Sequence, residues 1–466
     1  MRYRLTVVAL ALATAPLTAS AAETLKVPFE YHKLDNGLKV VLSKDTTAPT
    51  ATVTVYYNIG FRIEPKGRTG FAHLFEHLMF QGSGNLGKME FVRLIQKNGG
   101  VMNGSTRFDF TNYYQVVPAN TVETVLWAEA DRMKGLAIDQ DNLTNQQGVV
   151  KNEVKVNVLN QPYGGFPWID MPMTANTNWY NAHNFYGDLA ELDAATLADA
   201  KSFFETYYSP NNAALVVSGD IDPAQTLAWI KKYFGSIKAV TLPPSADISE
   251  PRQEKEKRAV KHYPEAPRPA LAVAYHAPGR MTPEYFAMGL IDQILLQGKD
   301  SRLHQALVQD KGYTDEVSGG INSDLGNLFD INGPTFLQAY LFHDKTTSTE
   351  AVLAAFDAEI EKLRAAPIDV ATLDLAKVKA RSWLYAQMED FFGFGKANLL
   401  ASFALFDDDP GRINGLEAEF AKVTPELIQK TAQEYLRSTN RTILTVPGKA
   451  DAPKADSPKS SNQEAN

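Results

Sequence analysis

Cysteine is absent from this chain of 466 residues. This absence excludes disulfide bridges, thiolate zinc sites and cysteine nucleophiles. A basic excess is also missing: Lys and Arg number 46 against 54 Asp and Glu, and the formal net charge of −8 disfavours nucleic acid as a partner. Beyond the first residues, no window is apolar enough to cross a bilayer. The composition that remains, with 44% hydrophobic residues, is that of a globular protein with two or three domains.

The first 21 residues have the pattern of a secretory signal peptide. Two arginines precede an apolar stretch from residue 5 to about residue 17, and Ala19-Ser20-Ala21 is a small-x-small cleavage site before Ala22. The alternative is a short membrane anchor, but the stretch falls short of the ~20 residues that a span needs. We therefore expect an exported, acidic protein of a bacterial periplasm, without a membrane span.

Similar segments recur at matching places in the two halves of the chain. Residues 78–82 match 294–298, and residues 138–139 match 368–369. Strand-like runs alternate with long helical patterns, which predicts the α+β class with two homologous α/β-sandwich domains, each a mixed sheet with helices packed on it, related by duplication. The expected organisation is a signal peptide (1–21), an N-terminal domain (22–242), a charged linker (243–258), a C-terminal domain (259–446) and a disordered tail (447–466).

The strongest chemical signal lies in the apolar segment 69–81. If this segment is helical, with Thr69 as its N-cap, then His73, Glu76 and His77 fall at positions i, i+3 and i+4 on one face. Two imidazoles one turn apart can reach the same metal ion, and the carboxylate between them can reach a water beside it. Two unrelated histidines are the alternative. With 8 histidines in the chain, such a triplet arises by accident in roughly one chain in a hundred.

A hydrolytic zinc site needs a third protein ligand, and the candidate is Glu153. This residue lies in a second helical pattern, over about residues 143–159, among several valines that suggest a buried helix. An unpaired buried carboxylate is costly, so Glu153 needs a partner. From periodicity alone, a surface salt bridge explains this residue at least as well as a metal ligand does.

Taken together, these residues resemble a known enzyme family. His73-Leu74-Phe75-Glu76-His77 is the H-x-x-E-H signature of inverted zincins. The chain resembles the pitrilysin/insulysin zinc metallopeptidases, in the two-domain branch that includes the β subunit of the mitochondrial processing peptidase and bacterial periplasmic relatives. The resemblance also rests on residues 67–72, 81–83, 99–106, 111–114, 150–153, 208–212 and 219–220. It covers the mature chain up to the tail and is looser in the second half.

The resemblance implies a zinc-dependent endopeptidase that hydrolyses extended peptides or unfolded segments and holds one Zn²⁺ per chain. In that scheme His73, His77 and Glu153 are the metal ligands. Glu76 is the general base, which takes a proton from the attacking water and returns it to the leaving amine.

The resemblance also implies a strand that binds substrate. Asn103, Gly104 and Ser105 fall on the strand that in this family pairs with the substrate backbone. A plain edge strand without that role is the alternative. Gln146 stands where the family often has a second glutamate, two helical turns before Glu153. It can hydrogen-bond behind the ligands, but it cannot add a charge.

The second half departs from the zinc-binding pattern. Gly289, Asp292 and Gln293 align with the three polar residues of the signature, and Trp383 falls opposite Glu153. We therefore expect no zinc site in the second domain.

Family members also carry an Arg and a Tyr in the second half, which hold the substrate and the developing oxyanion. Here Val308 and Asp315 stand at those positions. The resemblance therefore implies a heterodimer with a related exported subunit that supplies the pair. A homodimer that recruits Tyr313 or Arg302 is the fallback.

Non-catalytic roles compete with the peptidase hypothesis. The chain could be a scaffold or a zinc-binding subunit of a two-chain complex, as in the respiratory-complex core proteins that resemble this family. The intact signature and Glu153 count against this alternative. Glu76 also disfavours a pure binding protein, because a closed metal site needs no general base.

Overall fold

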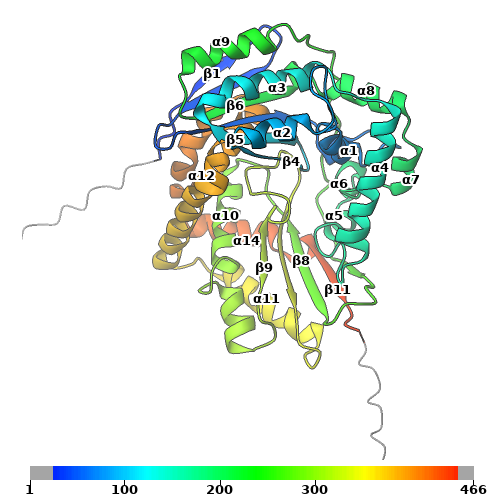
Figure 1. Cartoon of the computed structure of the whole chain (residues 1–466). Coiled ribbons are helices and arrows are strands. Elements are labelled where there is room, and N and C mark those ends of the chain that lie inside the picture. Colours follow the sequence, from blue (N-terminus) through cyan, green and yellow to red (C-terminus); the bar gives the residue numbers. More distant parts are fainter. Residues whose placement is uncertain (1–24, 450–466) are drawn as a thin grey trace, which may run out of the picture.

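The computed structural model describes residues 25–449, which form two β-sheets covered by helices (Figure 1). The first domain contains β1 (Glu30–Lys33), β2 (Lys39–Lys44), β3 (Thr50–Tyr57), β4 (Val101–Thr106), β5 (Thr111–Pro118), β6 (Ala213–Gly219), α1 (Phe71–Leu78), α2 (Glu90–Lys97), α3 (Val122–Lys134), α4 (Gln140–Val154), α5 (Asp170–Ala175), α6 (Trp179–Ala182), α7 (Leu189–Ala194), α8 (Leu197–Tyr207) and α9 (Pro223–Phe234). The second domain contains β7 (Lys257–Val260), β8 (Ala270–His276), β9 (Ser318–Ile321), β10 (Phe336–Phe342), β11 (Arg441–Val446), α10 (Pro283–Leu295), α11 (Thr349–Ala365), α12 (Val370–Asp407), α13 (Leu416–Ala421) and α14 (Pro425–Tyr435). The predicted signal peptide and most of the predicted tail lie outside the described residues.

The two sheets share one topology. The first has the strand order β1-β2-β6-β3-β5-β4, and the second has the order β7-β11-β8-β10-β9. The pairs β2–β6 and β7–β11 are parallel, and the remaining pairs are antiparallel. Taken in chain order, β7 to β11 occupy the same places as β2 to β6. The predicted α+β class with two duplicated domains is confirmed.

Helix α1 is oriented by its apolar side. Phe71, Leu74, Phe75 and Leu78 are buried in the core of the first domain. These positions follow the i, i+3, i+4, i+7 pattern of one helix face, so the opposite face is left for the three polar residues of the signature. Packing of the apolar face therefore determines where the polar face points.

The start of α1 differs from the prediction. Thr69 is not the N-cap, because its hydroxyl donates to Glu191 and accepts from the backbone N–H of Asp188. Gly70 precedes the helix instead, with a left-handed φ of 83°. Its amide and that of Ala72 donate to the carboxylate of Glu64.

The predicted linker (243–258) extends two residues too far, into a strand. Lys257 begins β7, which pairs in parallel with β11. The alternating charges of this segment suit an edge strand as well as a solvated loop, since every second side chain of such a strand faces outward. Upstream, Glu250 accepts hydrogen bonds from the amides of Thr177 and Asn178, which attach the segment to the first domain.

Each domain covers a sheet of the other. Val41, Tyr56 and Val216 of the first sheet belong to the hydrophobic core that contains α12. Reciprocally, α5 packs on the second sheet, with Met171 in the same cluster as Leu444. Figure 1 shows α12 beside the first sheet and α5 near β11. Within the described residues, no helix is both long and apolar enough to span a membrane.

Candidate metal centre

Three side chains from two helices converge at one point. His73 and His77 lie on α1, and Glu153 lies near the end of α4. The two imidazole Nε2 atoms are 3.3 Å apart. Glu153 Oε1 is 3.5 Å from His73 Nε2, and Glu153 Oε2 is 3.2 Å from His77 Nε2. Helical periodicity predicts that the two histidines lie on one face of α1. The packing of α4 against α1 places the Glu153 carboxylate beside them.

These distances fit a single zinc ion. Ligand atoms about 2.1 Å from a tetrahedral centre are about 3.4 Å apart, which is close to all three separations. Two imidazoles and one carboxylate form a donor set typical of hydrolytic zinc, with a fourth position left for water. Among the described residues, this is the group of His, Asp and Glu side chains with the spacing of a metal site.

The protonation states also suit metal ligands. Burial, together with the charge of His77, lowers the pKa of His73 to about 4, so this imidazole is neutral at pH 7. Burial raises the pKa of Glu153, but the hydrogen bond from His77 and the electrostatic interactions with the two histidines outweigh this effect, and the pKa is lowered overall. A metal ion binds the deprotonated forms of these groups. His73 is 5% exposed and Glu153 is 27% exposed, so the site is open on the carboxylate side.

Glu76 lies beside the three converging side chains and is hydrogen-bonded to Thr106. Its Oε2 accepts a hydrogen bond of 2.7 Å from the hydroxyl of Thr106, on the edge strand β4. Burial raises the pKa of the Glu76 carboxyl above its ordinary value, against the opposing effect of the Thr106 hydrogen bond. A carboxylate with a raised pKa is a better proton acceptor at neutral pH.

A cavity of about 390 Å³ opens in front of these groups. Asn103, Gly104 and Ser105 line it, as the substrate-strand hypothesis requires, and β4 is the last strand of the sheet. A Cβ atom on Gly104 would lie 3.2 Å from Glu76 Cγ. The strand therefore passes close to the expected base, and glycine allows that approach.

Gln146 does not take its expected place. Its amide donates to Asn145 Oδ1, and it is not among the residues that line the cavity. It stands seven positions before Glu153, a rise of about 10 Å along α4, which is too far for a contact with the Glu153 carboxylate. Tyr186 does contact a ligand: its hydroxyl donates to Glu153 Oε1 at 3.2 Å.

Sequence reasoning missed Tyr186, Glu64 and Arg107. Arg107 lines the cavity, and its charge acts to lower the pKa of Glu76. Arg107 directly follows residues 99–106, which carry part of the family resemblance, so its position next to that segment is a signal that could have identified it. Tyr186 and Glu64 lie in loops without periodicity, and no pattern in the sequence points to them.

Within residues 25–449, the second domain brings neither zinc ligands nor the expected Arg and Tyr to this cavity. Its lining residues from that domain are Leu325 and Phe394, and neither Arg302 nor Tyr313 is among them. Asp315 forms an ion pair with Arg268 at 2.8 Å.

At the place that corresponds to Glu76, Asp292 is buried in α10. Burial raises its pKa to about 7, and it accepts a hydrogen bond from Gln297.

The chain is similar to several proteins described as proteases. The family described as insulinase (peptidase family M16) matches residues 39–164, and the peptidase M16 inactive domain matches residues 194–379. The zinc protease PqqE of Helicobacter pylori is 27% identical over 88% of this chain and 91% of its own length. A crystal structure of a protease from Helicobacter pylori has a TM-score of 0.83 and 26% identity, and covers 90% of this chain and 100% of that chain. The periplasmic protease PqqL from Escherichia coli has a TM-score of 0.73 and 17% identity, and the match covers 91% of this chain but 48% of PqqL.

Proposed function

Because this chain belongs to peptidase family M16, we propose that it is a zinc-dependent endopeptidase that cleaves extended peptides, with Glu76 as its general base. The observation that carries the proposal is the placement of Glu76 beside His73, His77 and Glu153, in a cavity bordered by an edge strand. A metal-binding protein without turnover does not require a carboxylate at that position.

The residues divide the chemistry among them. His73, His77 and Glu153 would hold a Zn²⁺ ion, which would supply a water with a pKa of ~7 and polarise the scissile carbonyl. Glu76 takes the proton of the attacking water and passes it to the leaving amine. Thr106 holds the Glu76 carboxylate in position through its hydroxyl. The outer edge of β4 pairs with the substrate main chain, which accepts many sequences because main-chain hydrogen bonds do not depend on the side chains.

Cleavage of a quenched fluorescent peptide tests the proposal. We expect a chelator to abolish cleavage and added Zn²⁺ to restore it. Glu76→Gln should keep zinc and lose turnover by about 10²–10⁴-fold or more, because it removes the base and leaves the ligands. Glu123→Gln, which changes an exposed glutamate on α3, is the matched control. Near-normal turnover by a zinc-loaded Glu76→Gln protein would refute the role of Glu76.

A non-catalytic member of the family is the second candidate. The family description of the second half names an inactive domain, and Gly289, Asp292 and Gln293 provide no histidine ligand there. Tight zinc binding without cleavage of any peptide would favour this candidate.

We also propose a partner with the same two-domain architecture. The cavity lacks the Arg and Tyr expected from the second half, and the PqqL chain is about twice as long as the part of it that matches this chain. A second two-domain chain could supply that pair. Full activity of the purified chain alone, abolished by Arg302→Ala and Tyr313→Phe, would refute the heterodimer and show that a shifted loop of this chain supplies the pair.

For location we propose the periplasm. The pattern of residues 1–21 supports export, and PqqL, which shares the fold, is described as a periplasmic protease. Cell fractionation, and a mature N-terminus near Ala22 by mass spectrometry, test this proposal. A cytoplasmic protein with intact residues 1–21 would contradict it.

A further inference from the structure

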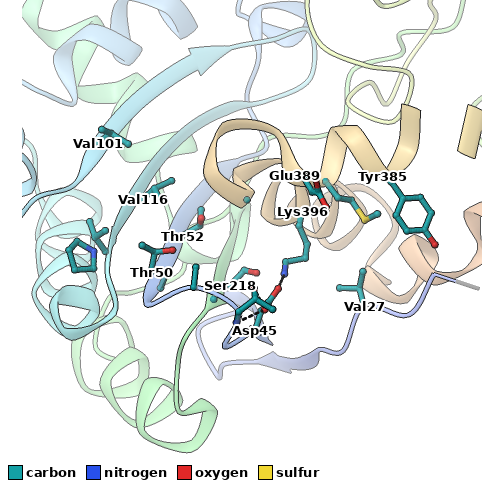
Figure 2. Close-up of a pocket in the computed structure, with 18 of the residues that line it drawn as sticks. Val27, Asp45, Thr50, Thr52, Val101, Val116, Ser218, Tyr385, Glu389 and Lys396 are labelled. Atoms are coloured by element: carbon teal, nitrogen blue, oxygen red, sulfur yellow. Dashed lines mark hydrogen bonds and ion pairs between the residues drawn. The ribbon is translucent and has the colours of Figure 1, made fainter. Parts of the chain in front are cut away.

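A second cavity, of about 790 Å³, lies between the first sheet and α12 (Figure 2). Its size is within the range of ligand-binding pockets. Hydroxyl side chains of the sheet line it, namely Thr50, Thr52 and Ser218. Apolar side chains from the sheet, from α12 and from the chain before β1 also line it, namely Val27, Val101, Val116 and Met388. The cavity is therefore apolar, with a few fixed polar groups.

Strand β4 connects this cavity with the metal centre. Val101, at the start of β4, lines the second cavity, whereas Asn103 to Thr106 line the cavity of Glu76. The side of β4 away from β5 has no strand partner among the described residues. At a rise of about 3.3 Å per residue, Ser105 and Val101 are about 13 Å apart along the strand. One extended peptide paired with β4 can therefore pass both cavities.

The alternation of side chains determines which peptide residues enter each cavity. Gly104 and Thr106 of β4 face Glu76 on α1. Val101 is separated from these two residues by an odd number of positions, so it points to the other face of the sheet, towards α12. Directly opposed residues of neighbouring strands point to the same face. The peptide residue opposite Val101 therefore directs its side chain to the second cavity, about three to five residues from the scissile bond.

The polar groups of the cavity point to a ligand. Ser218 is 3% exposed, lines the cavity, and its hydroxyl has no hydrogen-bond partner among the described residues. Such a buried hydroxyl is costly unless a ligand supplies a partner. Lys396 of α12 is already paired with Asp45 at 2.5 Å, as the dashed line in Figure 2 shows. Because this ammonium is neutralised and Glu389 also lines the cavity, the cavity disfavours an anion and favours an uncharged, apolar group.

We propose that the second cavity is a substrate subsite for a large apolar residue of the peptide, about three to five residues from the scissile bond. The proposal rests on the proposed peptidase function, because it takes β4 as the strand that binds substrate. The apolar side chain of the peptide passes Val101 to enter the second cavity. Val101 is 43% exposed.

Two peptides and two variants test the subsite. The anchor position is the peptide residue that lies opposite Val101. The two peptides differ only at this position, which is Phe in one and Ala in the other. The pair is made twice, once with the anchor before the scissile bond and once with the anchor after it. Val101→Glu places a carboxylate at the cavity mouth, and Val370→Glu makes the same change at a valine that is 66% exposed at the start of α12, outside both cavities. Binding is measured by fluorescence anisotropy in the zinc-loaded Glu76→Gln background, and cleavage is measured in the wild-type background.

We expect Val101→Glu to weaken binding of the Phe peptide about ten- to a hundredfold, the contribution of one buried apolar side chain, and to raise its KM. The Ala peptide and the Val370→Glu chain should show no such change. Binding that depends on Val101 without any cleavage, by the chain alone or with a related two-domain subunit added, would keep the subsite and refute the peptidase. Cleavage with no preference for Phe over Ala would keep the peptidase and overturn the subsite. Binding of laurate that Val101→Glu abolishes, with no preference for Phe, would assign the cavity to acyl chains and also overturn the proposal.

Discussion

At the residue scale, the ligand candidates differ in how firmly they are held. His73 is buried, and its Nδ1 atom has no hydrogen-bond partner among the described residues, so packing rather than a hydrogen bond orients its ring. Glu153 is more exposed and has an orienting partner, the hydroxyl of Tyr186. Groups that hydrogen-bond to a metal ligand commonly change metal affinity about 10–100-fold. Tyr186 is therefore expected to position Glu153.

Substitutions of Glu153 and Tyr186 test this arrangement. Glu153→Gln should sharply lower the zinc content measured by elemental analysis, because it replaces the anionic ligand with a neutral amide. Tyr186→Phe should keep zinc but weaken its affinity about tenfold in a chelator competition. Tyr435→Phe in the second domain is the control. If Glu153→Gln lost activity yet bound stoichiometric zinc as tightly as the wild type, Glu153 would not be a ligand.

At the element scale, α1 is a short helix that depends on its surroundings. It has eight residues, and isolated helices of that length are not stable in water. Its apolar face is anchored in the first core, and its free N-terminal amides are satisfied by Glu64. Glu64 is fully buried, in the neighbourhood of His183 at 3.7 Å. The position of the histidines on α1 therefore depends on a residue outside the helix.

Replacing Glu64 should show this dependence. Glu64→Ala leaves two buried amides of the α1 start without an acceptor, so we expect the free energy of unfolding to fall by about 2–4 kcal/mol in urea titrations. Glu90→Ala, which changes an exposed carboxylate at the start of α2, should cost less than about 1 kcal/mol. Equal effects of the two substitutions would show that Glu64 does not support α1.

At the scale of the whole molecule, the two domains share their cores. Helix α12 completes the core on one face of the first sheet, and α5 packs on the second sheet. Arg62 adds a polar link, since its fully buried guanidinium donates to Asp109 within its own domain and to the carbonyl of Pro334 in the other. Separating the domains would therefore expose apolar sheet faces and break buried hydrogen bonds.

This arrangement predicts one cooperative unfolding transition. Calorimetry of the intact chain should give a single peak, with a calorimetric enthalpy equal to the van't Hoff enthalpy. A fragment that ends at residue 242 should aggregate or bind ANS, because it lacks α12. Two resolved transitions, together with a soluble and cooperatively folded fragment, would contradict the shared core.

The sequence by itself determined the local features. Helical periodicity placed His73, Glu76 and His77 on one face, and recurring segments indicated the duplicated α+β fold, because both signals depend on residues close together in the chain. Their catalytic and ligand roles stay predictions that the proposed variants test.

Only the tertiary structure decided which distant groups meet. It placed Glu153 within 3.5 Å of both histidines, where periodicity had left a surface salt bridge open. In the structure Tyr186, and not Gln146, donates a hydrogen bond to Glu153. Arg302 and Tyr313 do not line the cavity of the metal centre. The physical reason is that such contacts follow from the packing of whole helices and loops, and a loop residue such as Tyr186 carries no periodic signal of the surface against which it will pack.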